Sequence, residues 1–144
     1  MGSFKRCIRD LFRGGQCIGN SPGMTRAQLK KTMGVMKKQC MGKIAVTEDK
    51  VGKIEEGVFP EDHDVMCFIL CIYQVGQVIK NGRLDMDSVY KQVDILYPVD
   101  MRERAKAAVN KCKTVQDKYS DSCEGVFHAA KCMQEADPEN FVFP

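Results

Sequence analysis

The feature that most restricts the fold is the spacing of six cysteines in residues 24–144. They are Cys40, Cys67, Cys71, Cys112, Cys123 and Cys132. Structural zinc usually takes two pairs of ligands a few residues apart, and only Cys67 and Cys71 are that close. A thioredoxin-like site needs two cysteines separated by two residues beside a parallel sheet, and the sequence has neither. The even number of cysteines in a small domain therefore favours disulfide bonds over a metal site, and no cofactor is expected.

The positions of Cys67 and Cys71 limit how the cysteines can pair. They lie one turn apart on the same face of a predicted helix, and such neighbours are poorly oriented to bond each other. Each should therefore bond a cysteine from a different element. Six cysteines can pair in many ways, and the residues alone do not select one. Because each bridge contributes about 2–4 kcal/mol, three bridges would let a small domain tolerate an internal cavity.

The pattern from residue 25 onward predicts an all-α fold of about six helices, and no alternating strand pattern is found. The first helix begins at Thr25, which forms a capping box with Gln28. The second begins at Thr47 and is closed by Gly57 and Pro60. The second is short, and each has an apolar face that needs a partner to cover it.

The third predicted helix is apolar on nearly every side and should form the buried centre of the fold. It begins at Asp62 or Asp64 and runs to about Lys80, where Asn81-Gly82 stops it.

The last three predicted helices begin at Asp85 or Asp87, at Asp100 and at Asp121. Capping boxes are expected at Asp100 and Asp121, because a glutamate follows each of them three residues later. After the final helix the chain ends on four residues, 141–144, that include two phenylalanines. This apolar tail is expected to fold back against the body, since burying two phenylalanines contributes roughly 3–6 kcal/mol before ordering costs.

The charge distribution separates residues 1–23 from the rest of the chain. The formal net charge of +3 arises in this segment, whereas residues 24–144 carry 18 basic and 18 acidic side chains. A neutral domain without a basic face is not expected to bind nucleic acid. Residues 1–23 are interpreted as an N-terminal extension that is mobile or was added for expression, in which Cys7 and Cys17 could pair with each other or between chains.

Two function classes are disfavoured by the sequence. The longest apolar run, Val65–Tyr73, has nine residues and is too short to cross a membrane. His63 and His128 are the only histidines, and neither belongs to a recognisable set of nucleophile, base and orienting acid. An enzyme is therefore not expected.

The cysteine spacing resembles that of the six-cysteine insect odorant-binding proteins. The gaps contain 26, 3, 40, 10 and 8 residues, and the gaps of 3 and 8 are the most constant in that family. The resemblance covers residues 24–144 and includes the apolar tail, as in members whose C-terminal segment reaches into the ligand cavity. It implies the bridges Cys40–Cys71, Cys67–Cys123 and Cys112–Cys132 around an internal hydrophobic cavity.

The resemblance also implies a function. Such proteins carry odorants, pheromones or fatty ligands through aqueous chemosensory fluid, so a secreted protein in sensillar lymph or another body fluid is expected. An olfactory receptor and a second copy of the chain are candidate partners. Some relatives release their ligand on acidification, which is a further hypothesis for this chain. The alternative is a disulfide-braced bundle that binds a protein through an apolar face.

Carried onto this chain, the resemblance predicts a set of cavity residues from five regions. Tyr73 and Gln77 are the polar members that could orient a ligand head group. The full set is Leu29, Met33, Met36, Tyr73, Gln77, Val78, Leu84, Val89, Val93, Leu96, Val126, Ala130, Met133, Phe141 and Phe143.

Overall fold

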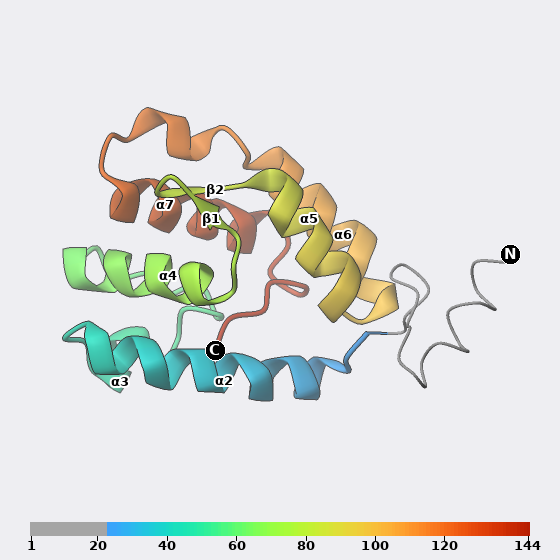
Figure 1. Cartoon of the computed structure of the whole chain (residues 1–144), viewed down its shortest axis with the longest axis horizontal. Helices are drawn as coiled ribbons and strands as arrows, with labels where there is room; N and C mark the ends of the chain where they lie inside the picture. Colours follow the sequence, from blue (N-terminus) through green and yellow to red (C-terminus); the bar gives the residue numbers. More distant parts are fainter. Residues whose placement is uncertain (1–22) are drawn as a thin grey trace, which may run out of the picture.

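Capping residues and apolar faces build six α-helices in residues 23–144, the part of the chain that the computed structural model describes (Figure 1). The helices are α2 (Arg26–Lys43), α3 (Glu48–Val51), α4 (His63–Val75), α5 (Met86–Leu96), α6 (Val99–Lys111) and α7 (Ser122–Ala136). A short hairpin of β1 (Ile79–Lys80) and β2 (Arg83–Leu84) joins α4 to α5, and a 3₁₀ turn, η1 (Val115–Lys118), precedes α7. The all-α prediction is confirmed, and the predicted extension, with Cys7 and Cys17, lies outside the described residues apart from Gly23.

The predicted helix starts are largely confirmed by hydrogen bonds. At α2 the Gln28 backbone N–H donates to Thr25 Oγ1 (3.1 Å) and the Thr25 N–H donates to Gln28 Oε1 (2.9 Å). Carboxylates at the N-caps Asp62, Asp85 and Asp121 accept backbone N–H groups of α4, α5 and α7. These contacts satisfy N–H groups that have no partner inside the helix.

The predicted end of the central helix is wrong, because α4 stops at Val75 and not near Lys80. Gln77 adopts a left-handed conformation (φ 66°), and the N–H groups of residues 77 and 78 return to the carbonyls of residues 74 and 73. This is the Schellman arrangement, which closes a helix C-terminus. Asn81 and Gly82 also have positive φ and form the two-residue turn of the hairpin, which the sequence did not predict.

Two other helix boundaries differ from prediction. Asp100 was expected to cap α6, but α6 begins at Val99 after Pro98, whose side chain makes no capping hydrogen bond. Pro98 is itself the N-cap (φ −55°, ψ 141°), and its carbonyl accepts the Met101 N–H (2.9 Å), so Asp100 lies inside the first turn of α6. The second helix begins after Thr47 as predicted but α3 contains only four residues, and turns continue the chain to Gly57.

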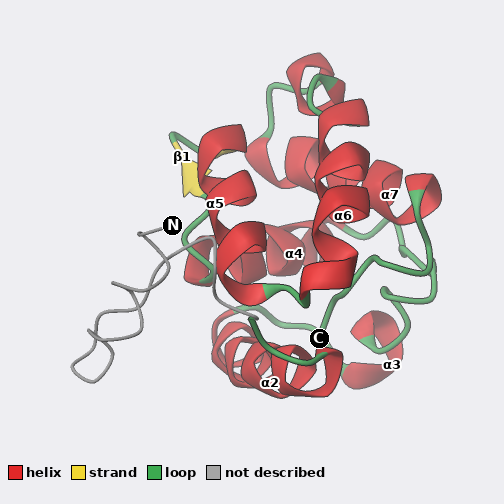
Figure 2. Ribbon diagram, turned by 90° about the vertical axis from the view of Figure 1, so that its right-hand side faces the viewer, coloured by secondary structure: helices red, strands yellow, loops and turns green. Residues whose placement is uncertain are grey.

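Helix α4 lies at the centre of the domain, with α2 along one side and α7 along the other (Figures 1 and 2). Its side chains Val65, Phe68 and Ile69 are fully buried, as the apolar sequence predicts. Helices α5 and α6 pack together at one end of this three-helix layer. The largest hydrophobic cluster is built around α4 and α7, and a second, small cluster joins Leu29 and Met101 to Val142 of the tail.

Three disulfides connect these helices in the pattern that the family resemblance implies. Cys40–Cys71 joins α2 to α4 (S–S 2.11 Å), and Cys67–Cys123 joins α4 to α7 (2.05 Å). Cys112–Cys132 joins the end of α6 to α7 (2.00 Å). Each of the two cysteines on α4 therefore bonds a different element, as their helical spacing requires. No helix in residues 23–144 is both long and apolar enough to span a membrane.

Candidate ligand-binding site

An apolar cavity lies between α2, α4, the hairpin, α5 and the C-terminal tail. The space inside it that protein atoms do not fill is about 710 Å³, including its opening to solvent. Nearly all of its lining is apolar. The lining residues are Leu29, Thr32, Met33, Met36, Ile72, Tyr73, Gly76, Val78, Leu84, Val89, Gln92, Val93, Leu96, Tyr97, Met133, Val142 and Phe143.

A second hollow of about 460 Å³ lies against the same tail, on the side of α6. It shares six lining residues with the first: Tyr73, Val89, Val93, Tyr97, Met133 and Val142. Its other lining residues include Ala105, Ala108 and Val109 of α6 together with Phe141. Because Val142 borders both hollows, the C-terminal tail forms part of the wall of each.

Two tyrosines are among the polar side chains at the cavity wall, together with Thr32 and Gln92 in the first cavity and Asp137 and Asn140 in the second hollow. Tyr73 and Tyr97 line both hollows, and neither hydroxyl hydrogen-bonds another group in residues 23–144. Burial, and to a lesser extent neighbouring Tyr97, raises the pKa of Tyr73 far above its ordinary value. Burial also raises the pKa of Tyr97 to about 12. Both hydroxyls are therefore neutral at pH 7 and each has an O–H group to donate.

The predicted cavity residues fall into three groups. Eleven line the first cavity, and Phe141 lines only the second hollow. Gln77, Val126 and Ala130 lie outside both. Gln77 is exposed because α4 ends before it and its backbone turns away, while Val126 and Ala130 are fully buried in the main core. The polar role predicted for Gln77 therefore has no support from its position.

Several lining residues were missed by the sequence analysis. Gln92 supplies the side-chain amide at the cavity wall, and its Nε2 donates to the Gly76 carbonyl (3.1 Å). Tyr97 follows the last residue of α5, where helical spacing no longer assigns a face. Val142 lies between the two predicted phenylalanines and packs against Leu29. Its helical spacing from Val89 and Leu96, three residues before and four residues after it, could have pointed to Gln92, but no comparable signal marks Tyr97.

The tail is held in place by α2 and by Glu55. Arg26 donates to the carbonyls of Glu139 (2.6 Å) and Phe141 (3.2 Å), and Lys30 donates to the carbonyl of Phe143 (2.6 Å). Glu55 Oε1 accepts the Phe143 backbone N–H (2.8 Å) and also pairs with Lys30 Nζ (2.9 Å). We call Arg26, Lys30 and Glu55 the tail clamp.

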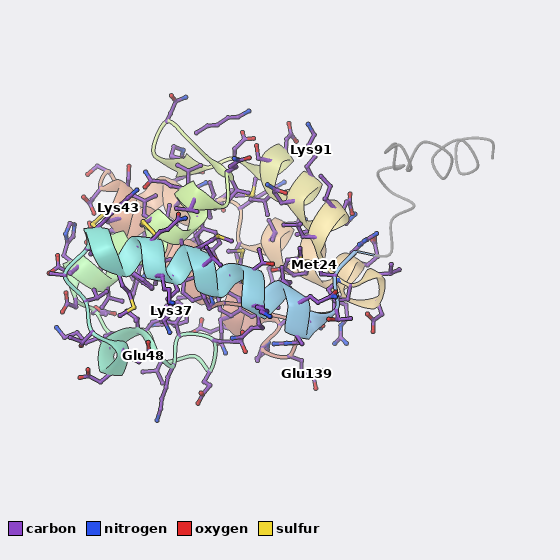
Figure 3. All side chains as sticks on the ribbon, turned by 60° about the horizontal axis from the view of Figure 1, so that its bottom comes forward. Met24, Lys37, Lys43, Glu48, Lys91 and Glu139 are labelled. Carbon is purple, nitrogen blue, oxygen red and sulfur yellow. A yellow bond between two sulfur atoms is a disulfide. The ribbon has the colours of Figure 1, made fainter. Side chains whose placement is uncertain are left out.

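Figure 3 shows α2 from the side, running across the molecule. Glu139 lies near the Met24 end of α2, and Lys43 marks the opposite end. Between these two ends, Lys37 of α2 pairs with Glu48 of α3 (2.8 Å). This ion pair holds α3 and the segment after it against α2. That segment carries Glu55, so the clamp is built from two elements that are themselves linked.

The two histidines lie away from the cavity. His63 is exposed at the first turn of α4 and contacts Asp121 (3.0 Å). His128 stacks on the Tyr119 ring with centroids 4.5 Å apart. Neither lines the hollows described above.

Comparison with known protein families and proteins finds several that are similar in sequence to this chain. Residues 23–136 match the model of the PBP/GOBP family. General odorant-binding protein 72 of Anopheles gambiae is 27% identical over 121 residues, which cover 84% of this chain and 99% of that protein. General odorant-binding protein 19a of Drosophila melanogaster is 30% identical over 125 residues, 85% of each protein.

Solved structures agree with the sequence comparisons. Apis mellifera odorant binding protein 5 superimposes with a TM-score of 0.76 at 34% identity, covering 85% of this chain and 99% of that one. Odorant binding protein 4 of Chrysopa pallens gives 0.75 at 35% identity, covering 84% and 99%. Proteins of this kind are soluble carriers of small hydrophobic ligands and not enzymes. The cysteine pattern, the helical fold and these relatives together establish that the chain belongs to the PBP/GOBP family of odorant-binding proteins.

Proposed function

We propose that this protein is a secreted carrier that holds one small apolar molecule in the cavity between α2, α4, α5 and the tail. The observation that carries the proposal is an apolar cavity wall containing two tyrosine hydroxyls that lack hydrogen-bond partners in residues 23–144. Such a site suits a hydrocarbon chain with one oxygen-bearing head, as in an odorant, a pheromone or a fatty acid-like ligand. The proposed fluid is sensillar lymph or another fluid outside cells.

The energetics fit a micromolar affinity. Burying a twelve-carbon chain contributes about 9–10 kcal/mol at about 0.8 kcal/mol per methylene. Association costs at least about 4 kcal/mol. Micromolar binding corresponds to about −8 kcal/mol, so one hydrogen bond to the head group and contacts with the tail must supply about 2–3 kcal/mol. Chain length is then discriminated weakly, by several-fold per methylene.

The tyrosines decide which ligands gain this extra affinity. A neutral hydroxyl can donate to a carbonyl, ester or hydroxyl oxygen of the ligand and accept from a hydroxyl. Hydrocarbons of the same length gain nothing from it. Tyr73 and Tyr97 should therefore add to the affinity of alcohols, aldehydes and esters over alkanes.

Displacement of an apolar fluorescent probe, N-phenyl-1-naphthylamine, tests the proposal. The protein should bind the probe, and dodecanol should displace it better than dodecane does. The substitutions Tyr73→Phe and Tyr97→Phe should each lower the affinity for dodecanol by about fivefold and leave the affinity for dodecane unchanged. Tyr90→Phe is the matched control, since Tyr90 contacts Asn110 on the surface. A wild-type protein that binds no probe contradicts the proposal.

The protein-binding alternative has less support. The exposed large apolar side chains in residues 23–144 are Val35, Val58, Ile95 and Val99. They come from α2, the segment after α3, α5 and α6, so they do not form the face of one helix. A candidate olfactory receptor and a second copy of the chain remain proposed partners of the loaded carrier.

A further inference from the structure

The three disulfides in residues 23–144 differ in how exposed their cysteines are. Cys40 and Cys71 are buried, with 0% and 5% of their surface exposed, and Cys112 is 1% exposed. Cys67 and Cys123 are both only partly buried. Of the bridges in residues 23–144, Cys67–Cys123 is therefore the one in which both cysteines keep some contact with solvent.

A histidine and a carboxylate lie beside this bridge. His63 Nδ1 is 3.6 Å from Cys67 Sγ, one helical turn along α4, and His63 Nε2 is 3.0 Å from Asp121 Oδ2. Both contacts can be N–H donations only when the imidazole is protonated. The side chain of His63 is 60% exposed, so it can exchange protons with solvent. Because the two sulfurs are bonded to each other, they are not thiolates that could ligate a metal with His63.

Asp121 keeps the imidazole in place. It is the N-cap of α7, where its carboxylate accepts the Glu124 backbone N–H (2.9 Å). This hydrogen bond, followed by the contact with His63, holds the pKa of Asp121 below its ordinary value. An ionised carboxylate that contacts Nε2 leaves Nδ1 facing the sulfur of Cys67.

We propose that Cys67–Cys123 is a thiol-exchange site whose co-reactant is a low-molecular-weight thiol. The thiolate of that molecule attacks Cys123 Sγ and forms a mixed disulfide with it. The Cys67–Cys123 S–S bond breaks, and its electron pair leaves on Cys67. His63 Nδ1 gives its proton to Cys67, so the products are a Cys123 mixed disulfide, a Cys67 thiol and a neutral imidazole.

The neighbours of the two sulfurs explain the choice of leaving group. Cys123 lies in the first turn of α7, where backbone N–H groups also favour a thiolate. The acidic side chains Asp121 and Glu124 in the same turn oppose that effect. Asp64, three residues before Cys67 in the first turn of α4, disfavours a thiolate there as well. Cys67 differs in having a proton donor, His63, in direct contact, so it can leave as a thiol. Cys67 therefore leaves, and the incoming thiol remains on Cys123.

The exchange should leave the domain folded. Cys40–Cys71 still joins α4 to α2, and Cys112–Cys132 still joins α6 to α7. Helices α4 and α7 also share the main hydrophobic cluster. The adduct would therefore form on a folded protein.

Limited reaction with reduced glutathione at pH 7 tests the proposal. Aliquots are quenched in acid, free thiols are alkylated, and the modified cysteines are located by peptide mass spectrometry. We expect glutathione on Cys123 and the alkyl group on Cys67, at least tenfold faster than opening of either buried bridge. His63→Ala should slow this reaction by about tenfold without changing the other two bridges.

Variants separate a proton donor from a merely structural residue. Asp121→Asn keeps an N-cap but removes the carboxylate, and should slow the exchange by several-fold. His128→Ala is the control and should react as the wild type does. Should His63→Ala fail to fold by circular dichroism, His63→Gln replaces it. The proposal is overturned if another bridge opens first, if glutathione is found on Cys67, or if the histidine variant reacts at the wild-type rate.

Discussion

The two sides of the domain are stabilised by different means. The side built from α4 and α7 has an almost fully buried core, and all three disulfides have at least one cysteine on these helices. The side built from α5, the start of α2 and the tail has a small cluster of Leu29, Met101 and Val142, with the cavity beside it. No disulfide in residues 23–144 involves α5 or the tail.

This difference shows how a small domain can contain empty space. Cavities lower stability because the groups that line them lose packing partners. The bridges lie on the well-packed side and compensate by restricting the unfolded chain. The cavity side is left to apolar contacts and to the tail clamp, which can rearrange without breaking a covalent bond.

The largest expected effect comes from removing a bridge on the packed side. The double substitution Cys40→Ser and Cys71→Ser opens a loop of 31 residues and should lower the free energy of unfolding by about 3–4 kcal/mol. Urea denaturation monitored by circular dichroism measures this. A loss below 1 kcal/mol would mean that core packing alone holds α2 against α4.

A smaller effect on stability, but a clear one on binding, is expected at the tail clamp. Glu55→Gln removes the charge that pairs with Lys30 and weakens the acceptor for the Phe143 N–H. We expect a loss of about 1–2 kcal/mol in the free energy of unfolding and a several-fold weaker affinity for the fluorescent probe. Glu56→Gln is the control, because Glu56 is exposed next in sequence. Equal binding by both variants would show that the clamp does not support the cavity.

The smallest effect concerns acid pH. The pKa values of three N-cap carboxylates lie below 3.8. The largest cause is the contact with Lys50 for Asp62, the Ser88 hydroxyl for Asp85 and the Glu124 backbone N–H for Asp121, and a backbone N–H of the helix adds to the lowering at Asp62 and Asp85. The stabilisation that each provides is present above pH 3.8 and is lost as the pH falls through the lowered value in the folded state. Asp62 and Asp121 start helices that Cys67–Cys123 joins, whereas Asp85 starts α5, which has no bridge.

Hydrogen exchange corrected for intrinsic rates should therefore show α5 losing protection below pH 3.8 before α4 and α7 do. Asp85→Asn retains a capping side chain without the titration, so the acid-dependent part of the loss in α5 should disappear. Simultaneous loss in all three helices would contradict the difference between the two sides.

Much of the fold follows from local sequence signals. Thr25 with Gln28 predicts the start of α2, and an almost wholly apolar helix must be buried, as α4 is. The end of α4 was not predictable in the same way. It depends on Gln77 accepting a left-handed conformation, for which glycine is the usual signal.

The cavity was predictable only where one face of a helix is clearly apolar. Leu29 and Val93 were chosen on this basis, and both line the cavity. Val126, Ala130 and Met133 share one stripe of α7, yet only Met133 reaches the cavity, because the earlier turns pack on α4. Helical spacing shows which residues share a face of a helix. It does not show where along the helix that face stops packing on the next helix and begins to line the cavity. The tail clamp was not predictable from the sequence either, because most of the groups that it contacts are backbone groups of the tail, which leave no pattern in the side chains.

The central claim, that the cavity beside α5 takes the ligand, is tested most directly by filling it. Val89 lines both hollows, and Ile95 lies on the same helix with 37% of its surface exposed. Titration of wild type, Val89→Phe and Ile95→Phe with N-phenyl-1-naphthylamine compares an inward and an outward phenylalanine, after circular dichroism has shown that both variants are folded. We predict that Val89→Phe lowers the affinity at least tenfold and that Ile95→Phe matches the wild type. Wild-type affinity in a folded Val89→Phe protein would contradict the account.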